Sequence, residues 1–322
     1  MKRYAVCIWA ALTAAFFVTA AAADDYPSRP IRVFTTSSAG GISDIFMRAL
    51  NEKMQSHLGQ PLIIENKPGG AGNIAARFCQ EAAPDGYTIC IINADTMIYN
   101  QFLYKQVPFD PEKGLTPIVN LFHLIQLLVV NSELGAKTVD DLVAVSKAKP
   151  GTLNYLTASI PCVVYMDTLK RDKGADWVRV PFKGGGEAVT AILSGTTPIG
   201  LFGLGNVQAH IKAGKMTALA LVNNIRTPQL PNVPTLADLG YNGAPSQTWY
   251  GLFAPARTPK PIVDKLNAEV RRVFEDKDFV EKFVISRGQV PAINSPEEFA
   301  KEIAADRAGA KEVVKASGLE PQ

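Results

Sequence analysis

The sequence has few of the residues that usually perform chemistry. It contains no G-x-S-x-G, H-E-x-x-H or C-x-x-C motif, so the common serine-hydrolase, zinc-protease and thiol–disulfide mechanisms are not indicated. Its three histidines, His57, His123 and His210, are isolated, and none has a carboxylate at metal-ligand spacing. We therefore expect a protein that is not an enzyme and that needs no metal and no cofactor.

An excess of charge of one sign is also missing. The chain has 33 Lys and Arg against 30 Asp and Glu, a net charge of +3. It has no basic stripe of the kind that follows a phosphate backbone, so we expect no nucleic-acid partner. The remaining composition, 47% hydrophobic and 20% charged over 322 residues, is typical of a folded chain with one large or two medium domains.

A long hydrophobic run occurs only at the N-terminus. Lys2 and Arg3 precede an apolar stretch over residues 4–19, and small residues continue to Ala23. This pattern predicts a signal peptide over residues 1–23 and export to the periplasm. A single membrane anchor is the alternative. No later segment reaches about 18 uninterrupted apolar residues, the length that spans a bilayer.

Cysteine is rare as well. Beyond the expected cleavage site the chain has Cys79, Cys90 and Cys162. Cys79 ends a predicted helix and Cys90 lies in the next strand, so these two could form a disulfide in an oxidising compartment. The alternative is three buried thiols that pack as small apolar side chains. The sequence leaves both open, because it does not place the Cβ atoms.

Short apolar strands alternate with helices along the chain, which is the pattern of an α/β fold. Gly59 is expected to end one helix, and Thr138 to cap another together with Asp141. The expected strands cover 31–35, 62–66, 87–93, 124–131, 153–157, 178–182, 197–203, 217–222 and 249–256. The expected helices cover 42–59, 73–83, 138–149, 187–195, 209–214, 259–276, 278–288 and 295–318.

Three glycine-containing loops join a strand to a helix, at 35–45, 66–73 and 181–189. Glycine lets the backbone approach a ligand closely, and the following helix offers unpaired N–H groups, so such loops suit anions. None has the G-x-G-x-x-G or G-x-x-x-x-G-K-[ST] spacing of nucleotide sites. We therefore expect an organic anion rather than a nucleotide, and we expect loop 66–73 to be the most purely structural of the three.

Eight motifs in order complete the picture: "YPSRPIRVF…GGISDI", "LGQPLIIENKPGGAGNIAA", "APDGYTI", "PGTLNY", "VPFKGGGEAVTAILSG", "HIKAGK", "LPNVPTLADLG" and "TWYGLFAPARTPKPIVDKLNAE". Together they cover about residues 26–320. In this arrangement the chain resembles the solute-binding receptors of tripartite tricarboxylate transporters, the Bug family. The resemblance implies a type II periplasmic-binding-protein fold, with two α/β lobes and a ligand cleft between them. Lobe 1 would comprise residues 24–125 and 235–322, and lobe 2 residues 126–234.

The resemblance also implies where the ligand binds. Transferred by position, the contacts are Ser37, Ser38, Ala39, Gly40, Gly41, Ser43 and Asp44 in the first loop, Asn93, Asp95 and Thr96 after the strand 87–93, and Thr157, Ala158, Ser159, Lys183, Gly184 and Gly185 in the second lobe. Asp44 either compensates the helix dipole or orients the ligand. Trp249 and Tyr250 either line the cleft or pack in the core.

Some positions depart from the family pattern. Ser37 replaces an aromatic residue that often faces the ligand, and Ile42 replaces the usual third glycine. The loop after Tyr155 is two residues shorter and contains Pro161. These changes predict a ligand with one carboxylate at the first loop and a less polar end toward the second lobe, such as an aromatic or short-chain monocarboxylate.

The function implied by the resemblance is non-enzymatic capture of a small organic carboxylate by cleft closure. The receptor, expected to be a monomer, would deliver its ligand to the membrane permease subunits of a tripartite transporter. One alternative is a ligand sensor whose partner is a two-component kinase. A secreted hydrolase is a further alternative, which the missing nucleophile–base pattern disfavours.

Overall fold

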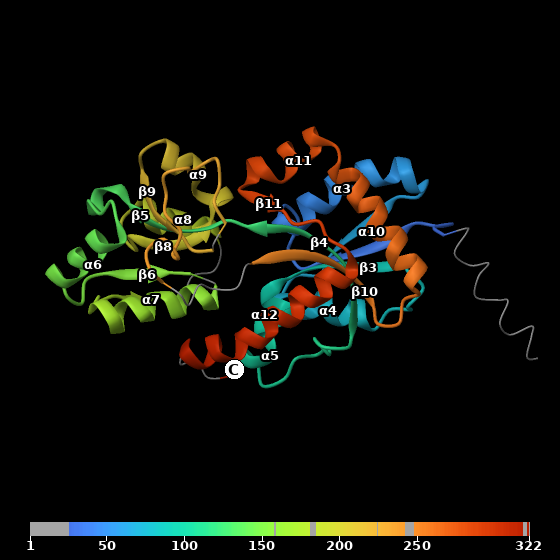
Figure 1. Ribbon diagram of the computed structural model, residues 1–322, viewed down its shortest axis with the longest axis horizontal. Coiled ribbons are helices and arrows are strands. Elements are labelled where there is room, and N and C mark those ends of the chain that lie inside the picture. Colours follow the sequence, from blue (N-terminus) through green and yellow to red (C-terminus); the bar gives the residue numbers. More distant parts are fainter. Residues whose placement is uncertain are drawn as a thin grey trace, which may run out of the picture.

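Two β-sheets organise the molecule, each in its own lobe (Figure 1). The computed structural model describes residues 26–157, 159–180, 185–223, 225–241, 248–317 and 321. The first sheet has six strands in the order β11-β4-β10-β3-β1-β2, and the second has five in the order β7-β6-β8-β5-β9. The expected α/β fold with two lobes is confirmed. In the described part of the chain, no helix has the length and apolar character needed to cross a membrane.

The first lobe combines parallel and antiparallel strands. Strands β1, β2 and β3 are parallel, whereas β10 runs antiparallel to both β3 and β4, and β11 runs antiparallel to β4. The strands are β1 (Ile31–Thr35), β2 (Leu62–Asn66), β3 (Thr88–Asn93), β4 (Leu115–Leu124), β10 (Trp249–Pro255) and β11 (Gln289–Pro291). The helices are α3 (Ile42–Leu58), α4 (Asn73–Gln80), α5 (Asn100–Leu103), α10 (Lys260–Phe274), α11 (Lys277–Phe283) and α12 (Pro296–Ser317). Short helical turns are η1 (Gly70–Gly72), η2 (Asp95–Tyr99) and η4 (Ile285–Arg287).

The second lobe has the same mixed character. Strand β6 is parallel to β7 and β8, and β5 is antiparallel to β8 and β9. The strands are β5 (Gln126–Asn131), β6 (Asn154–Leu156), β7 (Val178–Arg179), β8 (Ile199–Gly203) and β9 (Met216–Leu221). The helical elements are η3 (Ser132–Leu134), α6 (Val139–Ala148), α7 (Ile160–Lys173), α8 (Gly185–Leu193) and α9 (Leu204–Lys212). A separate apolar core lies beneath this sheet, with Trp177 and Leu142 fully buried.

Local signals fixed several element ends. Gly59 ends α3 in the left-handed conformation with φ 69°, which glycine adopts without a Cβ clash. Thr138 accepts a hydrogen bond from the Asp141 N–H while the Asp141 carboxylate accepts one from the Thr138 N–H, so the predicted capping box is confirmed. Strands β4 and β11 and helices α5 and α7 were not predicted from the sequence.

In the described part of the chain, one passage between the lobes lies at Ile125. Ile125 alone separates β4 of the first sheet from β5 of the second. On the return, Thr235 forms a bridge with Leu221 of β9, and Leu236 lies in the second-lobe core. The chain therefore stays with the second lobe beyond residue 234, later than expected. Helix α12 of the first lobe also contacts α7 of the second.

The cysteines resolve the alternative that the sequence left open. Cys79, in the last turn of α4, forms a disulfide with Cys90 in β3, with the Cα atoms 6.0 Å apart. Cys162 is a free, fully buried thiol in α7. The disulfide ties a helix to the central strand of the first sheet, directly behind the end of β3 where the candidate site begins.

Candidate ligand-binding site

A cavity of about 450 Å³ lies between the two lobes. Its walls come mainly from three first-lobe segments that follow β1, β2 and β3, together with Tyr250 of β10. The second lobe closes it with Ile160 and Arg179. The lining residues are Thr36, Ser37, Gly69, Ala71, Gly72, Asn93, Asp95, Asn100, Leu103, Tyr104, Ile160, Arg179 and Tyr250. Because the carboxyl ends of parallel strands meet at one edge of a sheet, this is where ligands bind in open α/β sheets.

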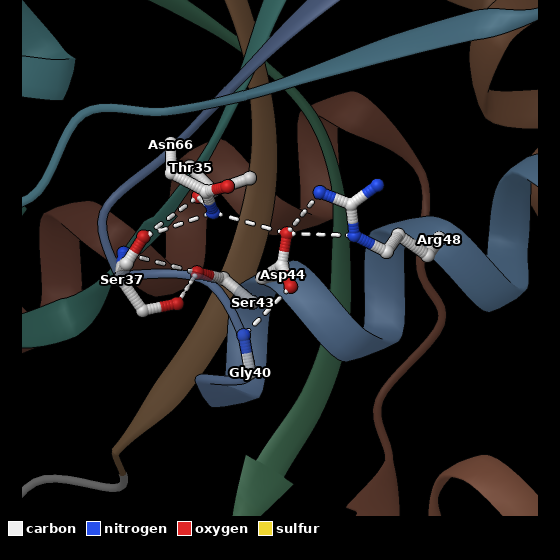
Figure 2. Close-up of polar contacts among 7 residues, drawn as sticks. All are labelled: Thr35, Ser37, Gly40, Ser43, Asp44, Arg48 and Asn66. Atoms are coloured by element: carbon white, nitrogen blue, oxygen red, sulfur yellow. Dashed lines mark hydrogen bonds and ion pairs between the residues drawn. The ribbon is translucent and has the colours of Figure 1, made fainter.

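The first loop is held in shape by its own hydroxyl groups (Figure 2). The Ser37 and Ser43 hydroxyls lie 2.5 Å apart, and the Ser37 N–H donates to the Ser43 Oγ at 3.3 Å. Ser37 lines the cavity, whereas Ser43 is fully buried beneath it. A Cβ on Gly41 would lie 2.5 Å from the Ser37 Cβ, so the tight turn requires glycine there.

Asp44 supports this loop through its carboxylate, which lies between Gly40, Arg48 and Asn66 (Figure 2). Its carboxylate accepts hydrogen bonds from the Gly40 N–H at 2.9 Å, from Arg48 Nε at 2.9 Å and from Asn66 Nδ2 at 3.0 Å. Burial opposes ionisation of Asp44, but the bonds from Arg48, Gly40 and Asn66 outweigh it and hold the pKa below its ordinary value. Asp44 is 3% exposed and is not among the cavity-lining residues, so the structure places it as a loop support.

The remaining residues of the first loop point elsewhere. Ser38 and Ala39 are exposed. Gly40 and Ile42 line a different cavity of about 310 Å³, which also touches Gly205 and Gly288. Of the seven first-loop residues expected to contact ligand, Ser37 is therefore the one that the structure brings to the interlobe cavity.

The loop after β2 contributes more than the sequence indicated. We expected loop 66–73 to be the most structural of the three, yet Gly69, Ala71 and Gly72 line the cavity. Ala71 has a positive φ of 51°, an uncommon conformation for a residue with a side chain. Its carbonyl accepts hydrogen bonds from Thr96 Oγ1 at 2.9 Å and Asn100 Nδ2 at 3.0 Å, and these bonds hold the loop against the segment after β3.

The segment after β3 supplies two polar side chains. Asn93 and Asp95 line the cavity, while Thr96 is buried behind them and donates from its hydroxyl to Asn93 Oδ1 at 2.6 Å. In the described residues no hydrogen bond or ion pair engages the Asp95 carboxylate, although it is only partly exposed. Burial raises the pKa of Asp95 to about 6.

Among its described residues, the second lobe offers one cation to the cavity, Arg179. Arg179 Nη2 donates to the Thr157 carbonyl at 3.3 Å, and in the described residues no carboxylate forms an ion pair with this guanidinium. Thr157 and Ser159 are buried and do not line the cavity. Ala158, Lys183 and Gly184 lie outside the described residues, and Gly185 begins α8. Arg179 was not predicted to contact ligand. Its position as the one charged residue of the expected strand 178–182 was the signal that could have identified it.

The two aromatic residues at the start of β10 have different roles. Tyr250 lines the cavity and stacks on Phe122 with ring centroids 5.5 Å apart. Trp249 is fully buried, and its Nε1 donates to Asp306 Oδ2 at 2.8 Å. Trp249 is thus a core residue and Tyr250 a cavity residue.

Two mixed sheets with a cavity between them define the class of two-lobed periplasmic binding proteins. Solved structures of this class superpose on the chain over nearly its whole length. A protein described as a periplasmic transporter is 34% identical, with a TM-score of 0.80, and covers 92% of this chain and 99% of its own. An R. palustris protein with adipate is 26% identical, with a TM-score of 0.81 and coverage of 92% and 100%. MatC from Rhodopseudomonas palustris with bound malate is 28% identical, with a TM-score of 0.75 and coverage of 90% and 100%.

The sequence comparisons lead to one family. The model for the tripartite tricarboxylate transporter family receptor matches residues 46–319. BugT of Bordetella pertussis is 29% identical over 301 residues, covering 92% of each chain. A Cupriavidus necator protein is 33% identical over 277 residues, covering 84% of this chain and 83% of its own. The chain belongs to the tripartite tricarboxylate transporter receptors, the family of solute-binding proteins that its sequence resembles.

Proposed function

We propose that this receptor captures a small organic carboxylate in the cavity between its lobes and passes it to the membrane subunits of a tripartite transporter. The observation that carries the proposal is the composition of the cavity wall. Hydroxyl, amide and backbone groups of the first lobe line it together with the Arg179 guanidinium of the second. Guanidinium matches the planar geometry of a carboxylate better than any other side chain. The relatives with adipate and malate add support.

Capture would work by hinge closure and without chemistry. The lobes are joined where β4 passes into β5 at Ile125 and where the chain returns to β10. A rotation about these connections would carry Arg179 and Ile160 toward the segments after β1, β2 and β3, as in other hinge-bending receptors. Arg179 lies in β7 and, among the described residues, donates to the Thr157 carbonyl of its own lobe, so it would move with that lobe.

The proposed setting is the periplasm, reached through a signal peptide cut after Ala23. The receptor would act as a monomer, because a cleft that must close tolerates few large interfaces. Its proposed partner is the membrane permease, which would recognise the closed form. Docking of the same closed form on a sensor kinase is the alternative outcome.

Thermal unfolding of residues 24–322 with mono-, di- and tricarboxylates, amides and sugars tests the proposal. A ligand at 100 times its dissociation constant stabilises the native state by about 2.7 kcal/mol, so a carboxylate should raise the midpoint. Arg179→Ala should reduce that rise, whereas Arg171→Ala should not, because Arg171 is an exposed arginine paired with Asp172 on α7. A response to neutral solutes alone, or an equal effect of both variants, would overturn the proposal.

A further inference from the structure

The cavity carries one charge of each sign. Among the described residues that line it, Asp95 is the acid and Arg179 is the base. The first comes from the start of η2 in the first lobe and the second from β7 in the other lobe. They do not form an ion pair with each other. A cavity of about 450 Å³ therefore presents a carboxylate on one lobe and a guanidinium on the other.

Among the described residues, Asp95 has no hydrogen-bond or ion-pair partner. Neither neighbouring amide donates to it among the described residues: Asn100 Nδ2 donates to the Ala71 carbonyl and to Asn73 Oδ1, and the Asn93 side chain bonds through its Oδ1, which accepts from Thr96. A partly buried carboxylate without a donor is costly, and native structures seldom keep one without a reason. The favourable field at the start of η2 offsets part of this cost. That field does not explain why the side chain lines the cavity.

Asp95 also conflicts with a ligand that is only an anion. A carboxylate bound in the same small cavity would be repelled by it, because like charges close together in a partly desolvated site disfavour each other. A ligand that also carries a positively charged nitrogen removes the conflict. Its cation would pair with Asp95 while its carboxylate reaches Arg179. Asp167 of α7 also lies in the field of this guanidinium, but no ion pair joins the two in the described residues.

We propose that the ligand is zwitterionic, a carboxylate that also bears a protonated nitrogen, with the nitrogen at Asp95 of the first lobe and the carboxylate at Arg179 of the second. This inference rests on the proposed function and names the substrate class of the same cavity. It replaces the expectation of a less polar end toward the second lobe, which was formed without knowledge that Arg179 lines the cavity. Ile160 leaves room for a short apolar spacer between the two charges.

Calorimetric titration with matched probes tests the assignment. Three pairs share a carbon skeleton, namely propionate and β-alanine, butyrate and 4-aminobutyrate, and glutarate and glutamate. In the fourth, cyclohexanecarboxylate and piperidine-4-carboxylate, a ring NH replaces one ring CH2. In at least one pair the amino compound should bind the wild type 10-fold or more tighter than its nitrogen-free partner. Asp95→Asn should cost that amino compound 10-fold or more and leave the nitrogen-free acid equal or tighter. Asp172→Asn, at an exposed acid on α7, is the matched control and should change neither.

The outcomes separate this inference from the proposed function. If nitrogen-free acids bind and amino compounds bind no better, the receptor function stands and the zwitterion assignment fails. If Asp95→Asn and Arg179→Ala weaken every acid equally, the two residues pair with each other on closure, and the assignment also fails. If no carboxylate of either kind binds, the proposed function itself fails. A midpoint for Asp95→Asn at or above the wild-type value establishes that the variant is folded.

Discussion

Asp44 and Asp95 occupy similar places and have opposite surroundings. Each stands in the first helical turn after a parallel strand of the same sheet, Asp44 after β1 and Asp95 after β3. Asp44 accepts three hydrogen bonds and its pKa is lowered, whereas Asp95 has no hydrogen-bond donor among the described residues and its pKa is raised to about 6. The comparison teaches that the two carboxylates have different uses. A carboxylate whose hydrogen bonds are supplied by the protein stabilises the shape of the site, and one without such bonds is available to bind the ligand.

The largest effect is expected from replacing Asp44, the aspartate that supports the first loop. Asp44→Ala removes the acceptor for Gly40, Arg48 and Asn66. At about 1 kcal/mol for each hydrogen bond, the free energy of unfolding should fall by about 2–3 kcal/mol. Denaturant unfolding measures the loss, with Asp172→Asn as the surface control. A change no larger than that of the control would contradict the supporting role of Asp44.

The second prediction concerns Asp95, whose replacement should raise the free energy of unfolding and not lower it. Asp95→Asn should stabilise the ligand-free protein by about 1–3 kcal/mol at pH 7.5, since a pKa raised by roughly two units costs that much when the group is ionised. Because solvent in the cavity screens the Asp95 charge, we expect a gain in the lower part of this range of about 1–3 kcal/mol.

The pH dependence of this gain checks its origin. The native state holds the Asp95 proton more tightly than the unfolded state does, so the ionisation cost is full above pH 6 and vanishes as the pH falls toward 4. The stability gained by Asp95→Asn should therefore be full above pH 6 and disappear as the pH falls toward 4. Among the described residues, the titratable groups around Asp95 are Arg179, Tyr104, Tyr250 and Cys162. Guanidinium, phenol and thiol groups ordinarily titrate outside this window. An advantage that persists unchanged at pH 4 would refute the account.

The smallest effect concerns Arg48, the exposed partner of Asp44. Its guanidinium is 56% exposed and pairs with Asp44 four residues earlier in α3. Such helix pairs contribute about 0.3–0.5 kcal/mol, so Arg48→Ala should reduce stability far less than Asp44→Ala. A double-mutant cycle with the two variants measures the pair directly. A coupling above about 1.5 kcal/mol would show that the ion pair, and not the bonds from Gly40 and Asn66, holds the loop.

The sequence predicted elements where the signal was local. Helix α3 with its Gly59 end and the capping box at Thr138 follow from residues within a few positions of one another. Helix α7 was missed because its start, Ile160 and Pro161, was interpreted as part of a loop after β6. Pro161 lies in the first turn, where the missing N–H would have had no helical partner.

The site residues likewise fall into those that a local signal predicted and those that it did not. Ser37, Asn93 and Asp95 were predicted and do line the cavity, because each follows a strand at the edge of the sheet where ligands bind. Arg179, Gly69 and Ala71 were not predicted. Their place depends on contacts between segments distant in the chain, such as the bonds from Thr96 and Asn100 to the Ala71 carbonyl.

The sequence by itself determined the α/β pattern and the strand ends from which a ligand could be held, because apolar periodicity, caps and glycine loops act over short distances. The family and its two-lobed architecture followed from the resemblance that the eight ordered motifs carry. The tertiary structure decided which of the two similar aspartates, Asp44 or Asp95, receives hydrogen bonds from the protein. That choice depends on whether Asn66 and Arg48, or no donor at all, lie within hydrogen-bond distance of the carboxylate. It also decided that a guanidinium of the second lobe lines the same cavity, since only folding brings Arg179 and Asp95 to one space.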